Sequence, residues 1–468
     1  MIKFLNTLSG QKEEFIPIKN KKVGIFVCGP TVYDWPHIGH ARTYVIFDVI
    51  VKYLRYKGYK VKFVMNITDI DDKIIDRAKE EKKTWKEVAE FYEKDFMKDI
   101  AELGINSVDK FARATEHTEQ IIKQIKVLIE KGYAYQTEDG IYFDISKFDD
   151  YGKLSKRTVE QAEDAVSRID ESINKRNKGD FVLWRLSKEG EPAWDFETGI
   201  TNSAGRPGWH IEDTAISEKY LGQQYEIHGG GQDLIFPHHE AEIAQAEAAS
   251  GEKPFVKYWL HSGFLTINGQ KMSKSLKNFI TIKDILKGYL PEAVRFMILS
   301  THYRSPIDYK EDLIKQSEAG IQRVLELVNK LELIKKSGPE EKKVEIDEII
   351  KNVQMEFNAK MDDDFNTPEA VAALFNFIRI VNSFIDNQNL DRKSAEKAIG
   401  VLKEIDEVFG ILPKKESGIP EKIFELVQNR EKLRKEKAWL EADKVRDEVK
   451  SLGYSIEDTP YGPLVKKS

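Results

Sequence analysis

A repeated order of buried strand, loop and helix near the start of the chain constrains the fold more than any other feature. Val23–Val27 is an apolar strand pattern that ends in Cys28–Pro30, and the stretch from Ile38 has a helical pattern. A second strand pattern follows at Tyr59–Met65. Strands that alternate with helices predict a doubly wound parallel sheet, whose ligands bind at the carboxyl ends of the strands. We therefore expect a Rossmann-like α/β domain with its functional loops at that edge.

The later pattern predicts an insertion and a helical second half. Residues 111–206 are mixed in pattern and rich in polar turns, which indicates a domain inserted between 1–110 and 207–284, the two halves of the α/β domain. In the second half, Tyr225–Ile227 predicts a strand, a glycine run predicts a loop, and Pro237 opens an alanine-rich helix. Beyond about Asp284 the pattern is helical, and charged breaks separate 285–338, 339–415 and 416–468. The last of these ends with strand and turn signals.

Composition limits the class of protein. The chain has 468 residues, 41% hydrophobic and 32% charged, which is typical of a multidomain globular protein and excludes a disordered one. Its start has no apolar stretch of signal-peptide length, and no window approaches the ~20 apolar residues that span a bilayer. Cys28 is the only cysteine, so a reducing compartment is expected. We expect a cytoplasmic protein without a membrane segment.

Two histidines lie at the start of the helix predicted from Ile38. The segment PTVYDWPHIGH places His37 and His40 about one helical turn apart. Because a helix N-terminus attracts anions, both imidazoles can donate hydrogen bonds to a triphosphate, and Gly39 lets a flat base approach the backbone. Taken alone, two surface or capping histidines explain the motif equally well.

A second motif, KMSKS, lies at 271–275. It follows the strand-like segment GFLTING, so two ammonium groups and two hydroxyls share one short loop. Such a loop can neutralise charge on departing pyrophosphate. A solvated basic loop is the ordinary interpretation of five such residues, but the PHIGH segment upstream makes that interpretation improbable.

Together the two motifs resemble the signature of class I aminoacyl-tRNA synthetases, whose HIGH and KMSKS elements bind ATP and stabilise adenylate formation. The resemblance implies four catalytic residues, His37, His40, Lys271 and Lys274. It implies Mg²⁺ bound with the nucleotide. The ATP-binding residues that it implies are Pro30, Gly39, His40, Gly230, Asp233 and Lys274.

A third group of residues suits a metal ion. His238 and Glu242 share one face of the helix that Pro237 opens, and Cys28 lies beside the first motif. Thiolate, imidazole and carboxylate are all zinc ligands, although a fourth ligand is needed for a closed tetrahedron. Spacing alone leaves a polar loop histidine and a solvated glutamate as the simpler interpretation.

Six segments make the resemblance specific to the cysteinyl-tRNA synthetase family. They match in order and spacing through nearly the whole chain: CGPTVYDWPHIGHAR, NITDIDDKII, GRPGWHIED, HGGGQDLIFPHHEAEIAQ, KMSKSLKNF and STHYRSPI. That family usually holds zinc with two cysteines, a histidine and a glutamate, which implies Cys28, His238 and Glu242 here. Asp213 occupies the place of the second cysteine, and its carboxylate is a harder but normal zinc ligand. One Zn²⁺ per chain is therefore expected.

The resemblance also implies a substrate and its pocket. Gly29, Thr68 and Trp209 are implied to bind cysteine, although a strand-end cap and a core indole are ordinary roles for the last two. Zinc prefers a thiolate to the hydroxyl of serine, which gives selectivity at the first step. The expected substrates are L-cysteine, ATP and tRNA(Cys), and a monomer is expected.

The helical half resembles the tRNA-binding parts of the family. Residues 285–338 resemble its stem-contact region, 339–415 its helical bundle against the anticodon stem, and 416–468 its small anticodon-binding module. In this last segment the chain reads Gly462-Pro-Leu-Val465, whereas family members commonly have glycine, threonine and tryptophan there. The anticodon contacts at this end therefore stay open.

Three alternatives remain open at this point. A ligase that joins cysteine to an amino sugar shares the catalytic motifs but lacks the long C-terminal half. A non-catalytic tRNA-binding paralogue would be expected to lose residues of HIGH or KMSKS, and both are intact here. The aspartate at 213 leaves open a pocket that accepts another amino acid.

Overall fold

The computed structural model describes residues 1–157, 161, 172–196, 204–272, 278–341, 346–412 and 420–467. They form two compact units. Unit 1 contains Met1–Gly288, Thr301–Lys310 and Asp362–Phe365. Unit 2 contains Tyr289–Ser300, Glu311–Met361 and Asn366–Ser468.

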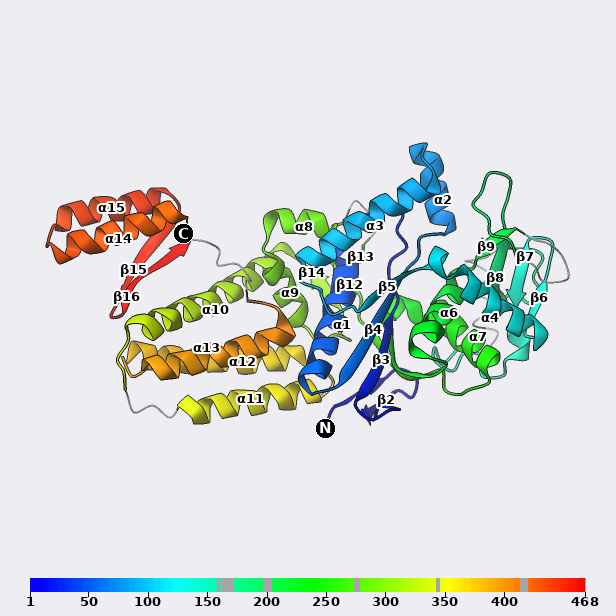
Figure 1. Cartoon of the computed structure of the whole chain (residues 1–468), viewed down its shortest axis with the longest axis horizontal. Helices are drawn as coiled ribbons and strands as arrows, with labels where there is room; N and C mark the ends of the chain where they lie inside the picture. Colours follow the sequence, from blue (N-terminus) through cyan, green and yellow to red (C-terminus); the bar gives the residue numbers. More distant parts are fainter. Residues whose placement is uncertain are drawn as a thin grey trace. The chain divides into compact units, whose positions relative to one another are not determined.

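Unit 1 is built on a parallel sheet (Figure 1). In spatial order its strands are β11 (Val256–Ser262), β10 (Tyr225–Gly231), β3 (Lys22–Val27), β4 (Lys60–Ile67) and β5 (Lys110–Arg113). The chain runs from β3 outward to β5 and later places β10 and β11 on the other side of β3. The strand order therefore reverses between β3 and β10, and ligands of such sheets bind at the reversal. This confirms the predicted doubly wound α/β fold.

Helix α1 (Ile38–Tyr56) connects β3 with β4 and lies in the core. Every residue from Tyr44 to Val51 is buried, which requires packing on more than one side of the helix. The remaining helices of unit 1 are α2 (Asp72–Glu81), α3 (Trp85–Glu102), α4 (Thr118–Glu130), α6 (Trp209–Leu221), α7 (Glu240–Ser250) and α8 (Ile282–Gly288). Short helical turns occur at η1 (Ala114–His117), η2 (Ile145–Lys147), η3 (Gln232–Leu234) and η4 (Ile235–His239).

The glycine run at 229–231 lies in a strand, which corrects the loop expected from the sequence. Gly229, Gly230 and Gly231 pair with Leu260, His261 and Ser262 as the last residues of β10. A Cβ atom on Gly229 would meet the ring of Phe47 at 2.0 Å. Glycine is therefore required because α1 packs closely against this strand.

The segment between β5 and β10 in the sequence forms an antiparallel sheet. Its strands are β6 (Ala134–Gln136), β7 (Gly140–Phe143), β8 (Phe181–Leu186) and β9 (Gly205–Pro207). Phe143, Phe181 and Trp184 from this sheet share one apolar core with Phe26 and Val64 of the parallel sheet. The two sheets of the unit are thus held by a common core.

Two smaller sheets complete unit 1. One is the hairpin β1 (Lys3–Asn6) and β2 (Gln11–Glu14), and the other contains β12 (Leu265–Ile267), β13 (Gln270–Lys271) and β14 (Ile307–Tyr309). The buried guanidinium of Arg42 in α1 donates to the carbonyls of Phe264, Tyr303 and Ser305. Arg42 therefore fixes the base of the β12–β13 hairpin, which leads into KMSKS.

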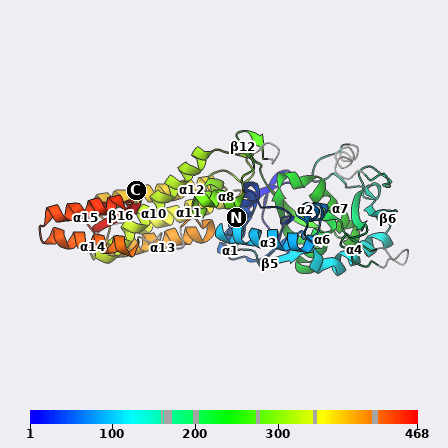
Figure 2. The same cartoon turned by 90° about the horizontal axis from the view of Figure 1, so that it is seen from above.

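Unit 2 is mostly helical, as predicted. Its first helices are α9 (Pro291–Leu299), α10 (Glu311–Ser337), α11 (Ile346–Asp362), α12 (Thr367–Asp386) and α13 (Arg392–Phe409). Helices α10, α12 and α13 run side by side in both views (Figures 1 and 2). Buried Arg295 of α9 donates to the carbonyl of Phe409 at the end of α13, at 3.0 and 2.7 Å.

Helix α12 corrects the expectation that no segment approaches the length and apolarity of a membrane span. Among the described residues it is the one helix that reaches both, with a mean hydropathy of 1.2. Its buried residues, which include Leu374, Phe377, Ile378 and Val381, recur at helical spacing. The apolar stretch is thus also suited to the interior of a helical bundle.

The C-terminal segment forms a small module of two helices and a hairpin. Its elements are α14 (Glu421–Lys435), α15 (Trp439–Ser451), β15 (Tyr454–Thr459) and β16 (Gly462–Lys467), which confirms the strand and turn signals. Ile423, Val427, Val449 and Ile456 form its core. Buried Arg430 makes a bidentate contact with Asp458 at 2.7 and 2.8 Å.

Candidate active site and metal centre

Cys28 lies at the point where the strand order reverses. It directly follows β3, and its backbone N–H donates to the carbonyl of Gly229 in β10 at 3.2 Å. Its thiol is buried. The fold thus places the only cysteine at the edge of the sheet where a ligand is expected.

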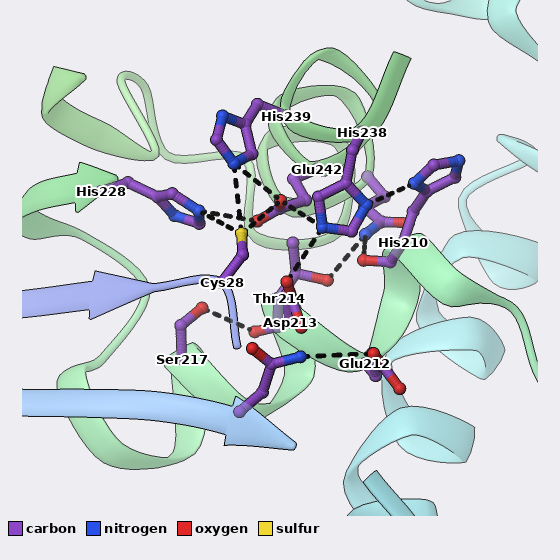
Figure 3. Close-up of polar contacts among 12 residues, drawn as sticks. Cys28, His210, Glu212, Asp213, Thr214, Ser217, His228, His238, His239 and Glu242 are labelled. Atoms are coloured by element: carbon purple, nitrogen blue, oxygen red, sulfur yellow. Dashed lines mark hydrogen bonds and ion pairs between the residues drawn. The ribbon is translucent and has the colours of Figure 1, made fainter. Parts of the chain in front are cut away.

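Four side chains meet at this position, and we call them the Cys28 cluster: Cys28, Asp213, His238 and Glu242. One ligand atom from each lies within 4.8 Å of the others. His238 Nε2 is 3.0 Å from Asp213 Oδ2 and 3.2 Å from Glu242 Oε1 (Figure 3). Asp213 comes from α6, His238 comes from the η4 turn, and Glu242, four residues later, comes from the start of α7. The structure thus brings together all four predicted metal ligands.

The donor set fits a zinc ion. All four side chains are buried, and Asp213 Oδ1 and Glu242 Oε2 make no hydrogen bond to the described residues. Burial raises the pKa of the Cys28 thiol well above its usual value, and the carboxylates of Asp213 and Glu242 raise it further. Several acidic groups in a dry site are costly unless a cation neutralises them. One sulfur, one nitrogen and two oxygen ligands form an acceptable zinc site.

Two further histidines face Cys28 and were missed from the sequence. His228 Nε2 in β10 lies 3.4 Å from Cys28 Sγ, and His239 Nε2 lies 3.2 Å from it. With Glu242 they form a second group whose ligand atoms also lie within 4.8 Å of one another. Two features of the sequence could have indicated their role. His228 directly precedes the glycine run, and His239 directly follows His238.

Trp209 lies on the ring of His238. The two rings are stacked, with centroids 4.2 Å apart and planes 24° apart. His210 Nδ1 holds His238 Nδ1 at 2.8 Å. This contact leaves Nε2 of His238 directed at Asp213 and Glu242. The indole proposed for the substrate pocket is thus adjacent to the Cys28 cluster.

Gly29 and Thr68 belong to one buried polar network. The Gly29 N–H donates to Asn66 Oδ1 at 2.6 Å, and the Thr68 N–H donates to the Pro30 carbonyl at 3.1 Å. The Thr68 hydroxyl donates to Glu212, and the amide of Asn66 reaches the same carboxylate at 3.3 Å. Neither Asn66 nor Glu212 was singled out from the sequence, although both lie inside the quoted segments. The network fixes the loop after β3 against the loop after β4.

His37 and His40 form the start of α1. His37 is the N-cap, its Nδ1 accepts from the Gly39 N–H at 3.0 Å, and His40 Nδ1 accepts from the His37 N–H at 3.2 Å. The rings are stacked with centroids 3.9 Å apart. Both nitrogens that accept are Nδ1, so each neutral ring carries its proton on Nε2. The capping role and a ligand-binding role are therefore compatible.

Burial determines the charge of the two rings. It lowers the pKa of His37 to about 4, although the carboxylate of Asp233 opposes this shift. Burial, followed by the charge of His37, lowers the pKa of His40 well below its usual value. Both imidazoles are neutral at pH 7 and present two N–H donors at a helix N-terminus, which suits an anionic ligand. A Cβ on Gly39 would meet the His37 ring at 2.8 Å, so the glycine makes room for the cap.

The remaining predicted residues have different positions. Gly230 lies in β10, and Asp233 lies in η3 just beyond that strand. The backbone of Lys271 ends β13. Lys274 lies outside the described residues, so its place in the site stays a prediction.

Known proteins resemble this chain over its full length. Residues 14–319 match the family model for the class I (C) tRNA synthetase catalytic domain, and 356–413 match the DALR domain. A cysteine–tRNA ligase of Thermodesulfovibrio yellowstonii is 47% identical over 483 residues, covering 98% of this chain and 98% of that protein. One of Thermococcus gammatolerans is 46% identical over 477 residues, covering 100% and 99%.

Solved structures share the fold at low identity. A methionyl-tRNA synthetase of Mycobacterium tuberculosis bound to methionyl-adenylate has a TM-score of 0.62 and 16% identity, covering 83% of this chain and 92% of that one. A LeuRS of Agrobacterium radiobacter K84 in a ternary complex has a TM-score of 0.63 and 11% identity, covering 85% of each chain. The family match and the full-length identity agree with the architecture. The chain therefore belongs to the cysteine–tRNA ligase family of class I tRNA synthetases.

Proposed function

We propose that this chain is an ATP-dependent cysteine–tRNA ligase. It activates L-cysteine to cysteinyl-adenylate and transfers the cysteinyl group to tRNA(Cys), releasing AMP and diphosphate. The observation that carries the proposal is the full-length match to cysteine–tRNA ligases in a chain whose only cysteine lies at the ligand-binding edge of the sheet.

Adenylate formation needs donors on the phosphates and no protein nucleophile. The carboxylate oxygen of cysteine attacks the α-phosphorus, and the bond from that phosphorus to diphosphate breaks. His37 and His40 donate their Nε2–H groups to the phosphates from the N-terminus of α1. Lys271 and Lys274 neutralise the departing diphosphate, and Mg²⁺ accompanies ATP. Pro30, Gly39, Gly230 and Asp233 line the nucleotide site.

The cysteine pocket lies between the two loops that follow β3 and β4. Gly29, Thr68 and Trp209 position the substrate, and Asn66 and Glu212 hold the first two in place. A zinc ion held by Cys28, Asp213, His238 and Glu242 would supply a centre that prefers a thiol to a hydroxyl. Trp209 stacks on His238, so the indole covers the imidazole of the site on one face. Selectivity against serine therefore follows from the donor set beside the pocket.

The second step uses the C-terminal parts of the chain. The terminal ribose hydroxyl of tRNA(Cys) attacks the adenylate carbonyl, and AMP leaves. The stem-contact region at 285–338, the bundle at 339–415 and the module at 416–468 bind the tRNA, in keeping with the DALR match at 356–413. Residues 1–110 and 207–284 are the catalytic domain, with 111–206 inserted. The chain works as a monomer in the cytoplasm.

Amino-acid-dependent ATP–pyrophosphate exchange tests the proposal. We expect exchange with cysteine and at least a hundredfold lower kcat/KM with serine, which corresponds to ~2.7 kcal/mol of discrimination. His37→Gln should reduce exchange strongly, because it removes a donor to the phosphates. Gly400→Ala, on helix α13 with no described atom within 4 Å of the added methyl, is the matched control. Exchange with no amino acid would favour a tRNA-binding paralogue, and exchange with a different amino acid would assign the pocket to that substrate.

One alternative needs a separate acceptor assay. A ligase that transfers cysteine to an amino sugar would also pass the exchange test. The match to relatives over 98 to 100% of this chain, including its helical half, favours tRNA as the acceptor. Transfer of cysteine to an amino sugar, with none to tRNA, would contradict the proposed function.

A further inference from the structure

His228 and His239 are directed at the Cys28 sulfur although they are outside the Cys28 cluster. Figure 3 shows both imidazoles pointing at the sulfur. His228 comes from strand β10, and His239 comes from the turn that precedes α7. Both rings are fully buried. Two imidazoles are therefore placed where a metal ion bound to Cys28 would also be within their reach.

The separations in this second group are close to those of a tetrahedral site. Bonds of about 2.3 Å to sulfur and 2.0–2.2 Å to nitrogen or oxygen place neighbouring ligand atoms roughly 3.3–3.6 Å apart. Cys28 Sγ lies 3.4 Å from His228 Nε2 and 3.2 Å from His239 Nε2. Glu242 Oε2 lies 3.5 Å from His228 Nε2, and Glu242 Oε1 lies 3.9 Å from His239 Nε2. The two Glu242 separations involve different oxygens, so the carboxylate has to turn slightly for one ligand atom of each residue to surround one ion.

The other nitrogen of each ring is hydrogen-bonded, as expected for metal ligands. His228 Nδ1 lies 2.6 Å from the Tyr225 hydroxyl. His239 Nδ1 lies 2.8 Å from His261 Nε2, and Thr7 Oγ1 lies 2.8 Å from the far nitrogen of His261. Such contacts orient a ring and direct its second nitrogen at the ion. Nε2 is the nitrogen directed at Cys28 in both rings.

The ligands of the two groups differ in charge. The Cys28 cluster has three anionic ligands and one neutral imidazole, so a divalent ion in it leaves a net charge of about −1. Cys28, Glu242 and two neutral imidazoles balance a divalent ion. Asp213 stays buried beside this group, so the total charge of the site is the same whichever group holds the ion. The single thiolate and Glu242 are common to both groups, so one ion can bind to either.

We propose that His228 and His239, together with Cys28 and Glu242, form a second ligand set for the divalent ion, of zinc type, that the Cys28 cluster binds. The two sets share two ligands and hold one ion at a time. Asp213 and His238 are therefore replaceable for metal retention, whereas Cys28 is not. The inference takes the kind of ion from the proposed function, but its test measures binding and is independent of activity.

Metal content of full-length double variants tests the proposal. Asp213→Ala/His238→Ala leaves the second set complete, and His228→Ala/His239→Ala leaves the Cys28 cluster complete. Each protein is saturated with Zn²⁺ or Co²⁺, passed through a desalting column and analysed for metal and for its Co²⁺ absorption spectrum. We expect one ion per chain in both double variants, with the sulfur-to-cobalt band kept and the ligand-field bands different between the two. Cys28→Ser should retain less than a tenth of the metal.

Milder substitutions and a control variant test the proposal if a double alanine variant does not fold. Asp213→Asn alone should bind Co²⁺ with at most a tenfold weaker affinity, and adding His228→Gln should abolish binding. His117→Asn changes a buried histidine whose partners, the Arg113 carbonyl and the Tyr220 hydroxyl, belong to neither set, and it should leave the wild-type metal content unchanged. Loss of the ion from Asp213→Asn, or from the folded Asp213→Ala/His238→Ala protein, would overturn the proposal. Two ions per wild-type chain would also overturn it, because the sets would then be independent sites.

Discussion

The side-chain oxygen of Asn66 accepts a hydrogen bond of 2.6 Å from the backbone N–H of Gly29. Asn66 lies near the end of β4 and Gly29 follows β3, so this contact joins the two loops that enclose the proposed cysteine pocket. The amide group of Asn66 reaches Glu212 and the Thr68 hydroxyl, both at 3.3 Å. One side chain thus positions groups on both sides of the pocket.

Replacing Asn66 by alanine is expected to weaken cysteine binding. The change leaves the half-buried Gly29 N–H without its acceptor, which costs roughly 1–3 kcal/mol. We expect the KM for cysteine in pyrophosphate exchange to rise about tenfold or more, with a smaller change in the KM for ATP. Asn66→Asp keeps an acceptor for the Gly29 N–H but loses the donor to Glu212 and places a second carboxylate beside it, so it should not recover the loss. Equal changes in both KM values would indicate a general structural defect instead.

Gly29→Ala is expected to be destabilising as well as inactivating. A Cβ at this position would meet the backbone carbonyl oxygen of Asn66 at 1.7 Å, so the loop after β3 has to move. We expect a loss of about 2 kcal/mol or more in the free energy of unfolding, measured with guanidinium. Gly400→Ala is the matched glycine control and should stabilise the protein by about 0.5–1 kcal/mol, because it lies inside a helix. A Gly29→Ala protein as stable as the wild type would contradict the packing of these loops.

Stability should fall in mild acid partly because of His37. Burial lowers the pKa of His37 to about 4, whereas an unfolded histidine titrates near 6.5. Between these values the unfolded chain binds more protons, so the contribution is present above about pH 6.5 and is lost as the pH falls toward 4. Protonation of Nδ1 would also break the hydrogen bond from the Gly39 N–H.

Unfolding at pH 7 and pH 5 measures this contribution. We expect the wild type to lose about 1–2 kcal/mol more than His37→Gln between the two values. An identical loss in both proteins would show that His37 does not titrate in this range. The comparison is independent of catalysis because it uses the free energy of unfolding alone.

Arg42 is expected to support the hairpin that leads into KMSKS. Arg42→Met removes donors to the carbonyls of Phe264, Tyr303 and Ser305, and we expect a loss of about 3 kcal/mol in stability and a higher KM for ATP. Arg55→Met is the control, because its pair with Asp109 is partly exposed and should contribute less than ~1 kcal/mol. Similar losses in the two variants would contradict a special role for Arg42.

The sequence predicted the parts of the site that local patterns determine. An apolar run predicts the strand before Cys28, and a helical pattern with a capping residue predicts the helix after His37. Helical spacing predicts that His238 and Glu242 lie close together. The position of Asp213 beside them came from the resemblance, because nothing local in α6 indicates what its side chain faces. Its meeting with Cys28 depends on the pairing of β3 with β10.

Long-range packing explains what the sequence did not predict. The sequence predicts a loop at the glycine run. In the structure the run extends β10, and Phe47 of α1 packs into the space that a side chain on Gly229 would take. In the sequence, His228 and His239 are only neighbours of a motif. They lie close to Cys28 because β10 and the turn before α7 fold against β3. The sequence predicts that Asn66 is a strand residue but does not predict its contact with Gly29.

Charging of a total tRNA pool with labelled cysteine tests the proposed cysteine–tRNA ligase activity in a single assay. The wild-type protein, ATP and Mg²⁺ are incubated with the pool and either labelled cysteine or labelled serine, and the acylated tRNAs are identified by sequencing. We expect cysteine to be attached to tRNA(Cys) alone and serine to be attached to no tRNA. Attachment of serine, or no charging by a folded protein with metal bound, would contradict the proposed function.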